Sequence, residues 1–435
     1  MLTSVKAGKR ICFERPRVRR IKVQMKSTRL APGLPVLAAA LLSFLPAVRA
    51  DMSTLAPAAT NVESMASIFS NSAANHQMIP DMRTSIIYIQ CHGLGYGDLS
   101  CYGQTNFQTP NLDKLAAQGI RFTNFRPGGN DFKTALGVLV SGKKTGAANA
   151  TTVADDLQAA GYHTGLIGEW TLNDKPWTRG FDEFAGFLGD DDGRNYFAGS
   201  IRRFAPHSWL TQSNSIIDYD GSDSIIENEG GKHGVFIPQL FANAMNNFVR
   251  IHKPDAGNGN KPFFLLVDLP APRSAAPNAD QFPVPSDAPF SGENWPQAAK
   301  DRAALITRID GSIGELFAEF RTQGMSNNIA IFFSSSEAPA KFKDAKLNFL
   351  KPNGAAVAGS DGAPGPLPMI VWCPEQIPAG QVSEFKWSGV DFLPTALEMS
   401  YARPVKDVDG MSVLPVLRGV KGAEVDRPVD GGRSF

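Results

Sequence analysis

The sequence predicts an α/β protein with a doubly wound, mixed but mainly parallel sheet and helices on both faces of that sheet. Three observations favour this fold: short apolar runs, amphipathic segments between them, and an ordinary composition over 435 residues. Apolar runs without polar alternation are typical of strands that are covered on both faces. With 43% hydrophobic and 20% charged residues, the chain has enough apolar side chains for a large soluble core.

The expected strands and helices alternate from Arg83 onward. A first strand over 86–89 is followed by a helix with Thr109 as N-cap, Pro110 in its first turn and Gly119 as its stop. The later elements, in order, are a helix over 152–160, a strand over 164–167, a helix over 238–251, a strand over 263–267, a helix over 298–320 and a strand over 329–333. In such a sheet the ligand crevice lies at the carboxyl ends of the strands. The stretches 190–232 and 268–296, rich in Pro, Asp and Gly, are expected to be loops that shape its mouth.

The first 82 residues are expected to lie outside the folded domain. Residues 25–50 have a basic start, an apolar run and small residues at the end, which predicts a secretory signal peptide. Residues 1–24 before it indicate a start codon assigned too early, and residues 51–82 are expected to be a flexible lead-in. We therefore expect a secreted or periplasmic protein without a membrane span after cleavage, with an uncleaved anchor as the alternative.

The charge of the mature chain argues against nucleic acid as a partner. Residues 1–50 hold eleven Lys and Arg and a single acid, so the remainder has 32 basic and 41 acidic residues. Three cysteines remain, which is too few for a disulfide framework. A Cys91–Cys101 pair stays open, although the apolar surroundings of Cys91 and Cys373 favour buried free thiols.

Several segments together resemble the sulfatase family, within the alkaline-phosphatase-like superfamily. They read LGYGDL at 94–99, PNLDKLAAQGIRFTNF at 110–125, GFDEF at 180–184, KPFFL at 261–265 and DFLPT at 391–395. The resemblance covers roughly residues 83–428 and implies a sulfatase-like α/β domain over 83–350. Residues 351–435 would then hold the remainder of that domain and a truncated small C-terminal subdomain.

The family's nucleophile is replaced in this sequence. The resemblance implies a cysteine, converted to formylglycine, at the start of a helix. Counting back from the helix end at Gly142 places Phe132 at that position. A one-residue slip would place Asp131 there, and a two-residue slip Thr134, whose hydroxyl is the alternative nucleophile.

The family's Ca²⁺ or Mg²⁺ ligands are also replaced. The first pair of aspartates reads His92 and Gly93, and the later Asp-Asn pair reads Ser336 and Glu337. A hard cation needs several carboxylate oxygens, so we expect neither a metal nor another cofactor. Cys91 and His92 are soft-metal ligands by type, yet consecutive strand residues point to opposite faces.

The residues that hold the sulfate and move protons in the family are missing as well. The matching positions read Leu136, Glu169, Thr171 and Arg273. The family residues at 169 and 273 both reach the sulfate, so the resemblance implies that Glu169 and Arg273 lie close together. We predict an ion pair between them across the vacated pocket, with Phe132 filling the nucleophile's space. The alternative is that both side chains point separately into solvent.

These replacements predict a secreted, catalytically inactive pseudo-sulfatase that serves as a binding scaffold. Its partner would be a sulfated or anionic glycan, or a protein, and Lys133 with Arg273 would attract the anion. Two alternatives stay open: an active sulfatase-like or phosphoesterase hydrolase with a rewritten site that uses Thr134, and a decayed gene product.

Overall fold

The computed structural model describes residues 83–129, 131–146, 150–189, 193–205, 219–277, 279–325, 327–353 and 366–423. The predictions for residues 1–24, 25–50 and 51–82, and for the chain after residue 423, lie outside these ranges.

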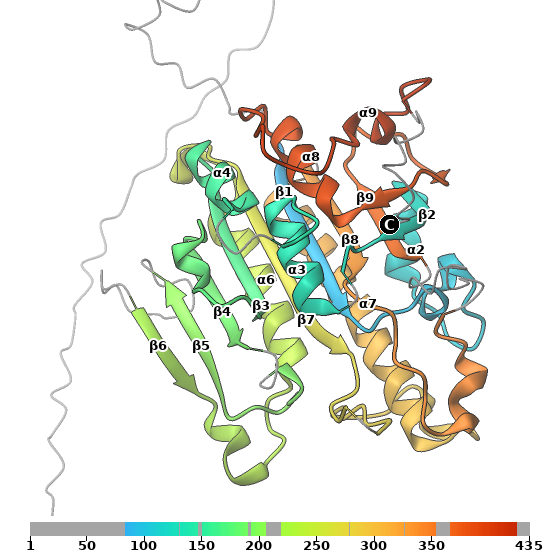
Figure 1. Ribbon diagram of the computed structural model, residues 1–435. Helices are drawn as coiled ribbons and strands as arrows, with labels where there is room; N and C mark the ends of the chain where they lie inside the picture. Colours follow the sequence, from blue (N-terminus) through green and yellow to red (C-terminus); the bar gives the residue numbers. More distant parts are fainter. Residues whose placement is uncertain are drawn as a thin grey trace, which may run out of the picture. The chain divides into compact units, whose positions relative to one another are not determined.

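One mixed sheet runs through the described residues in the order β10-β2-β9-β8-β1-β7-β3-β4-β5-β6, with β11 beside β2 (Figure 1). The five strands β8, β1, β7, β3 and β4 are parallel neighbours. Antiparallel pairs join β9 to β8, β2 to β9, β5 to β4 and β6 to β5. The strands are β1 Ser85–His92, β2 Ile120–Arg126, β3 His163–Trp170, β4 Glu183–Leu188, β5 Ser200–Ala205, β6 Tyr219–Ser224, β7 Phe263–Pro272, β8 Ile329–Ser335, β9 Leu367–Trp372, β10 Gln381–Ser383 and β11 Trp387–Ser388.

Helices cover both faces of the sheet (Figure 1). One face carries α2 Pro110–Ala117, α6 Ile237–His252 and α7 Gln297–Gln323, and the other carries α3 Phe132–Ser141, α4 Val153–Ala159, α8 Phe392–Met399 and α9 Leu414–Leu417. Strand β1 contributes to both cores, because Ile87 and Ile89 pack on the first face and Ile86 and Tyr88 on the second. The predicted doubly wound fold is confirmed.

Short 3₁₀ helices connect these elements. They are η1 Tyr96–Asp98, η2 Ser100–Tyr102, η3 Pro176–Thr178, η4 Ile226–Gly231, η5 Ala256–Asn258, η6 Phe290–Gly292, η7 Ala345–Leu350 and η8 Gly389–Asp391. No helix among the described residues is long and apolar enough to cross a membrane.

Local sequence signals account for the helix starts. Thr152 and Asp155 form a reciprocal capping box at α4, in which the Thr152 hydroxyl accepts from the Asp155 amide and the Asp155 carboxylate accepts from the Thr152 amide. Pro110 stands in the first turn of α2, where a missing amide costs nothing. The helices expected over 110–118 and 152–160 therefore form close to their predicted bounds.

Two loop predictions were wrong in part. The stretch 190–232 holds the antiparallel strands β5 and β6 as well as η4, and β7 extends to Pro272 at the start of the stretch 268–296. Strand β6 reads YDGSDS and forms the sheet edge, so it lacks the apolar run that marks a buried strand. The strands were predicted from apolar runs, which mark strands that are buried on both faces. A strand at the edge of the sheet, such as β6, buries fewer side chains and lacks such a run.

The three described cysteines are free thiols. The Cys91–Cys101 pair, left open from the sequence, is absent in this structure. Cys91 and Cys373 are buried in the two cores, as their apolar surroundings predict.

Candidate functional site

The carboxyl ends of β3, β7 and β1 meet at one edge of the sheet and carry a cluster of charged side chains. The strands are parallel neighbours, and their register places Gly168 beside Asp268 and Gln90 beside the same Asp268. Glu169 and His92 therefore stand on the strands that flank Asp268. This edge is where the ligand crevice of a doubly wound sheet is expected.

His92 lies between two carboxylates. It ends β1 and is fully buried, with Nδ1 3.0 Å from Glu169 Oε2 and Nε2 3.0 Å from Asp268 Oδ1. A neutral imidazole has one donor nitrogen, so an acceptor on each side favours the doubly protonated ring. Burial alone lowers the pKa of His92, but the charges and hydrogen bonds of Asp268 and Glu169 raise it to about 9. The two carboxylates on either side of His92 thus favour its protonated, positively charged form.

Glu169 and Arg273 form the predicted ion pair. One guanidinium nitrogen of Arg273, Nη2, donates to both carboxylate oxygens of Glu169, at 2.8 Å each. Glu169 is fully buried and Arg273 nearly so. The ion pair is confirmed, and the alternative that both side chains point into solvent is wrong.

Phe132 stands beside this pair, at the first residue of α3. The helix is capped by Asp131, whose carboxylate accepts a hydrogen bond from the Thr134 amide at 2.8 Å. The Arg273 guanidinium carbon lies 4.3 Å from the centre of the Phe132 ring, and the His92 ring centre lies 4.9 Å from it. An aromatic ring with the Arg273 guanidinium and the His92 ring against it therefore stands at the helix start.

The other two replaced polar positions are buried as well. Leu136, one turn into α3, is a fully buried member of the core under that helix. The Thr171 hydroxyl is buried directly after β3, and it has no hydrogen-bond partner among the described residues. Neither side chain offers a charge to a ligand.

The four positions that the sequence resemblance assigns to metal ligands do not form a hard-cation site. His92 is held by Glu169 and Asp268, and Gly93 has no side chain. The Ser336 hydroxyl donates to the Cys91 carbonyl at 3.3 Å, which leaves Glu337 as the single carboxylate of the four. Ca²⁺ takes six to eight oxygen ligands and Mg²⁺ six, so this donor set does not fit either ion. Within the described ranges, no group of three or more His, Cys, Asp or Glu side chains is placed to hold a metal.

The backbone around Gly93 also disfavours a side chain. Gly93 has a φ of +72°, and a Cβ built on it would lie 3.2 Å from the Arg273 Cα. An aspartate at this position would need a left-handed backbone and would crowd the segment after β7.

Glu337, the single carboxylate among the four positions, is partly buried. Burial raises its pKa above the ordinary value, although the positive charges of His92, Arg273 and Arg194 act to lower it.

Thr134, the alternative nucleophile, lies apart from this cluster. Its hydroxyl donates to Asp131 Oδ2 at 3.0 Å, within the cap of α3. Thr134 and the exposed Lys133 line a different cleft, of about 490 Å³, with Leu172 and Arg179. Lys133 and Arg273 thus line different clefts, and the prediction that they attract one anion together gains no support from this geometry.

Sequence reasoning missed Asp268 and the Asp98–Arg302 pair. Arg302 Nη2 donates to Asp98 Oδ2 at 2.6 Å and to the Gly93 carbonyl at 3.1 Å, and Nη1 donates to the Pro272 carbonyl at 2.9 Å. Arg302 thereby connects the segments that follow β1 and β7. The signal for Asp268 was present: a lone acid in the apolar run FFLLVDLP must find a partner when it is buried.

A cleft of about 330 Å³ opens beside the charged cluster. Gly93, Arg273 and Glu337 belong to its wall. Four further basic side chains line it, those of Arg194, Arg302, Lys341 and Lys343. Residues 273–277 and 279–282 contribute much of the rest, so part of the stretch expected to shape a ligand mouth does line a cleft.

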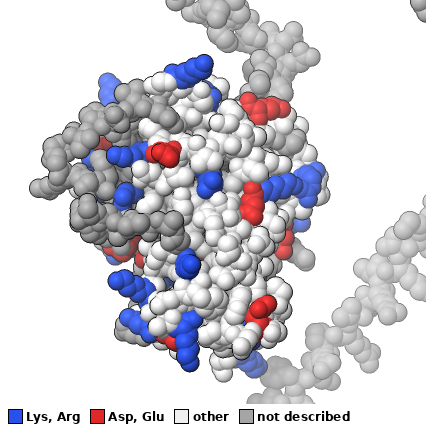
Figure 2. All heavy atoms as spheres, turned by 90° about the vertical axis from the view of Figure 1, so that its right-hand side faces the viewer, with Lys and Arg blue, Asp and Glu red and all other residues white. Residues whose placement is uncertain are grey.

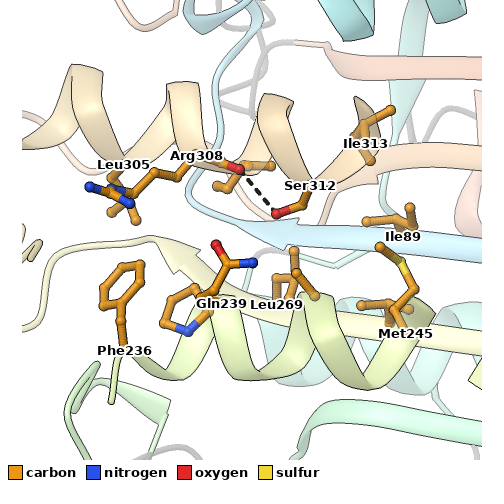
Figure 3. Close-up of a pocket in the computed structure, with 13 residues that line it drawn as sticks. Ile89, Phe236, Gln239, Met245, Leu269, Leu305, Arg308, Ser312 and Ile313 are labelled. Carbon is orange, nitrogen blue, oxygen red and sulfur yellow. Dashed lines mark hydrogen bonds between the residues drawn. The ribbon is translucent and has the colours of Figure 1, made fainter. Parts of the chain in front are cut away.

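A second, smaller cavity lies between α6 and α7 and has no comparable chemistry (Figure 3). Met245 of α6 and Ile313 of α7 face each other across Ile89 of β1, and Arg308 and Ser312 lie further along α7. Its volume is about 20 Å³, which is room for little more than one water molecule.

On the face drawn in Figure 2, Lys and Arg side chains are interspersed with Asp and Glu among many uncharged residues. The described residues of that face present mixed charge.

Comparison with known proteins places the sequence among sulfatases. It matches the Sulfatase family over residues 84–400. It is 25% identical to the N-acetylgalactosamine-6-sulfatase of Rattus norvegicus over 378 residues, which covers 79% of this chain and 67% of the relative. It is 27% identical to arylsulfatase A of Homo sapiens over 368 residues, which covers 77% and 68% of the two chains.

Solved structures agree with the fold. The complex of Ps i-CgsB with k-i-k-neocarrahexaose superposes with a TM-score of 0.60 at 23% identity and covers 77% of this chain and 76% of that one. A complex described as containing its substrate, D-glucosamine-2-N,6-O-disulfate, superposes with a TM-score of 0.56 at 19% identity and covers 80% and 82%. Because the family match extends over most of its length, the chain belongs to the sulfatase family.

Proposed function

We propose that this protein is a secreted or periplasmic member of the sulfatase family that does not hydrolyse sulfate esters and that binds an anionic saccharide in the cleft beside the vacated site. The observation that carries the proposal is the packing of Phe132, Arg273 and Glu169. The aromatic ring stands at the helix start, and the guanidinium that faces it is held by a buried carboxylate.

Hydrolysis of a sulfate ester needs a nucleophile, groups that stabilise the transferring anion, and an acid for the leaving group. Phe132 has no nucleophilic atom, and Leu136 has no charge. Arg273 is a cation, but its positive charge is already matched by Glu169 at 2.8 Å. Since each lost group typically lowers the rate by a factor of about 10² or more, their joint loss supports an inactive site.

Turnover assays test this part of the proposal. Purified protein is incubated with aryl sulfate and aryl phosphate esters, beside the Thr134→Ala variant. We expect product formation at the buffer rate for both proteins. Turnover by the wild type that disappears in Thr134→Ala would establish the rewritten hydrolase instead.

The lining of the 330 Å³ cleft supports binding of an anionic saccharide. Arg194, Lys341 and Lys343 line it, while the Asp280 carboxylate is turned to the backbone amides of Lys343 and Asp344, at 2.7 and 2.8 Å. The two lysines are exposed, and Glu337 lines the same wall as a carboxyl of raised pKa. A ligand with a negative group and hydroxyls would find complementary charges and hydrogen-bond partners there.

A thermal-shift screen with sulfated and phosphorylated sugars tests the binding part. We expect a rise in Tm that becomes smaller with added salt and in the double variant Lys341→Ala/Lys343→Ala. Lys133→Ala is the matched control, because Lys133 is an exposed lysine that lines the other cleft. Binding that is unchanged in the double variant would contradict the assigned cleft, and the absence of any shift would favour a protein partner over a saccharide.

The proposed location rests on residues 25–50 alone. Expression with export in a bacterial host, followed by mass determination of the mature chain, tests it. We expect a chain that begins at Asp51, and an intact N-terminus in the cytoplasmic fraction would contradict export.

A further inference from the structure

The charged cluster at the sheet edge is internally balanced. Its two carboxylates, Glu169 and Asp268, face two cations, Arg273 and His92. The contacts run in a chain of alternating sign, with Arg273 at 2.8 Å from Glu169, Glu169 at 3.0 Å from His92, and His92 at 3.0 Å from Asp268. Since all four side chains are buried, with Arg273 only 5% exposed, solvent screens these charges little.

The sulfatase resemblance implies a divalent metal ion near this sheet edge, whereas the charges of this cluster are balanced by protein side chains alone. A divalent cation would need Glu169 or Asp268 as ligands in addition to Glu337, because no other carboxylate stands at the matching positions. Both are already in contact with a protein cation. A divalent ion placed there would also lie against the positive charges of His92 and Arg273.

We propose that the Arg273 guanidinium and the His92 imidazolium serve as built-in cations at this sheet edge, where they take the charge-balancing role of a divalent metal ion and make the fold independent of metal. The proposal concerns the balance of charge in the folded protein. It stands whether or not the protein turns over an ester or binds a saccharide.

The surroundings hold both cations in place. The guanidinium of Arg273 lies over the Phe132 ring at 4.3 Å, and its backbone packs against Gly93, where no side chain intervenes. Arg302 bonds to the carbonyls of Gly93 and Pro272, the residues next to His92 and Arg273 in sequence. The positions of both cations are thus fixed by neighbours other than their carboxylate partners.

Asp268 has a further partner of its own. The Gln90 side-chain amide donates to Asp268 Oδ1 at 2.9 Å from within β1. The oxygen that contacts His92 is therefore also held by a neutral donor, so the strand end is organised by protein groups on both sides.

Chelation of the wild-type protein is the first test. Purified mature protein is treated with EDTA, its metal content is measured by mass spectrometry, and its Tm is recorded before and after addition of millimolar Ca²⁺ or Mg²⁺. We expect substoichiometric metal and a Tm that changes by no more than about 1 °C in either direction. A Tm that falls by several degrees on chelation and recovers with Ca²⁺ would overturn the proposal.

Removal of one built-in cation is the second test. Arg273→Met leaves Glu169 with a single cationic neighbour, and we expect its Tm to fall by roughly 10 °C. The matched control is Arg203→Met, which removes an arginine of similar burial from an ion pair with Asp223 at 2.8 Å on the peripheral strands. Asp223 is 32% exposed, so solvent compensates part of that loss and we expect a smaller fall in Tm.

Arg273→Lys covers the case in which Arg273→Met does not fold. Lysine keeps the positive charge without the planar guanidinium, so we expect a Tm between those of the wild type and Arg273→Met. A fall in Arg273→Met no larger than in Arg203→Met, or an Arg273→Lys protein that is no more stable than Arg273→Met, would contradict the role of the charge.

Discussion

Arg273 Nη2 donates to both carboxylate oxygens of Glu169, at 2.8 Å each, across the ends of β7 and β3. In the sulfatase resemblance these two positions reach one sulfate, so the protein has placed a carboxylate where the ligand's anion is expected. His92 and Asp268 extend the same pattern to β1. Internal ion pairs thus occupy the sheet edge where the resemblance places an anion and a metal.

The Glu169–Arg273 pair should show strong coupling in a double-mutant cycle. Glu169→Gln alone leaves Arg273 and His92 buried with less negative charge, and we expect a loss of about 3–5 kcal/mol in the free energy of unfolding. The double variant Glu169→Gln/Arg273→Met should lose less than the sum of the single variants, by at least about 1 kcal/mol. Urea unfolding of the four proteins measures the coupling, and additive losses would contradict a direct pair.

The stability of the protein should fall in the alkaline range because of His92. Its folded pKa is raised from 6.5 to about 9, so the native chain binds an extra proton between these values. The stabilisation is therefore fully present below about pH 6.5 and is lost as the pH rises through 9, with a total on the order of 3 kcal/mol.

Urea unfolding across this pH range, for the wild type and His92→Gln, measures the effect. Other groups titrate in both proteins, so the difference between the two curves isolates His92. We expect that difference to shrink as the pH rises. A difference that stays constant would mean that His92 is not the charged partner of Asp268 and Glu169.

Restoring an acid at Gly93 should destabilise the protein without creating a metal site. Gly93→Asp forces a side chain onto a φ of +72° and places its Cβ 3.2 Å from the Arg273 Cα, so we expect a loss of about 1–3 kcal/mol. Gly230→Asp is the matched control, since Gly230 has a φ of +68° and nothing within 4 Å of its Cβ position. Isothermal titration with Ca²⁺ should detect no binding to Gly93→Asp. Equal losses in the two variants would show that Arg273 does not crowd position 93.

Asp131 should contribute more to stability than Thr134, and Thr134 should have no catalytic role. Asp131→Ala removes the acceptor for the Thr134 amide and should cost about 1 kcal/mol. Thr134→Ala removes only the hydroxyl contact to Asp131 and should cost about 0.5 kcal/mol or less. Thermal unfolding measures both, and a loss in Thr134→Ala as large as in Asp131→Ala would contradict the assignment of Asp131 as the cap.

The sequence could predict the central strands and the main helices, because burial on both faces of the sheet produces apolar runs such as Ile86 to Ile89. It could not predict β6, whose edge position requires no apolar side chains. The rule that connects burial to hydrophobicity is informative only where both sides of a strand are covered.

The candidate site was predictable where the resemblance fixed positions in space. It placed Glu169 and Arg273 together although they are far apart in the chain, and the pair was confirmed. The partners of His92 were not predicted, since Asp268 matches no family motif and its contact depends on the register between β1 and β7. The role of Arg302 was also missed. The apolar periodicity of α7 does not show which carbonyl oxygens a buried arginine of that helix reaches.

The most direct measurement is a crystal structure of the mature protein grown with calcium and sulfate present. We predict Arg273 within hydrogen-bond distance of Glu169, His92 between Glu169 and Asp268, and neither ion beside Phe132. A sulfate ion held by Arg273 at the start of α3, or a calcium ion bound between Glu337 and Asp268, would contradict it.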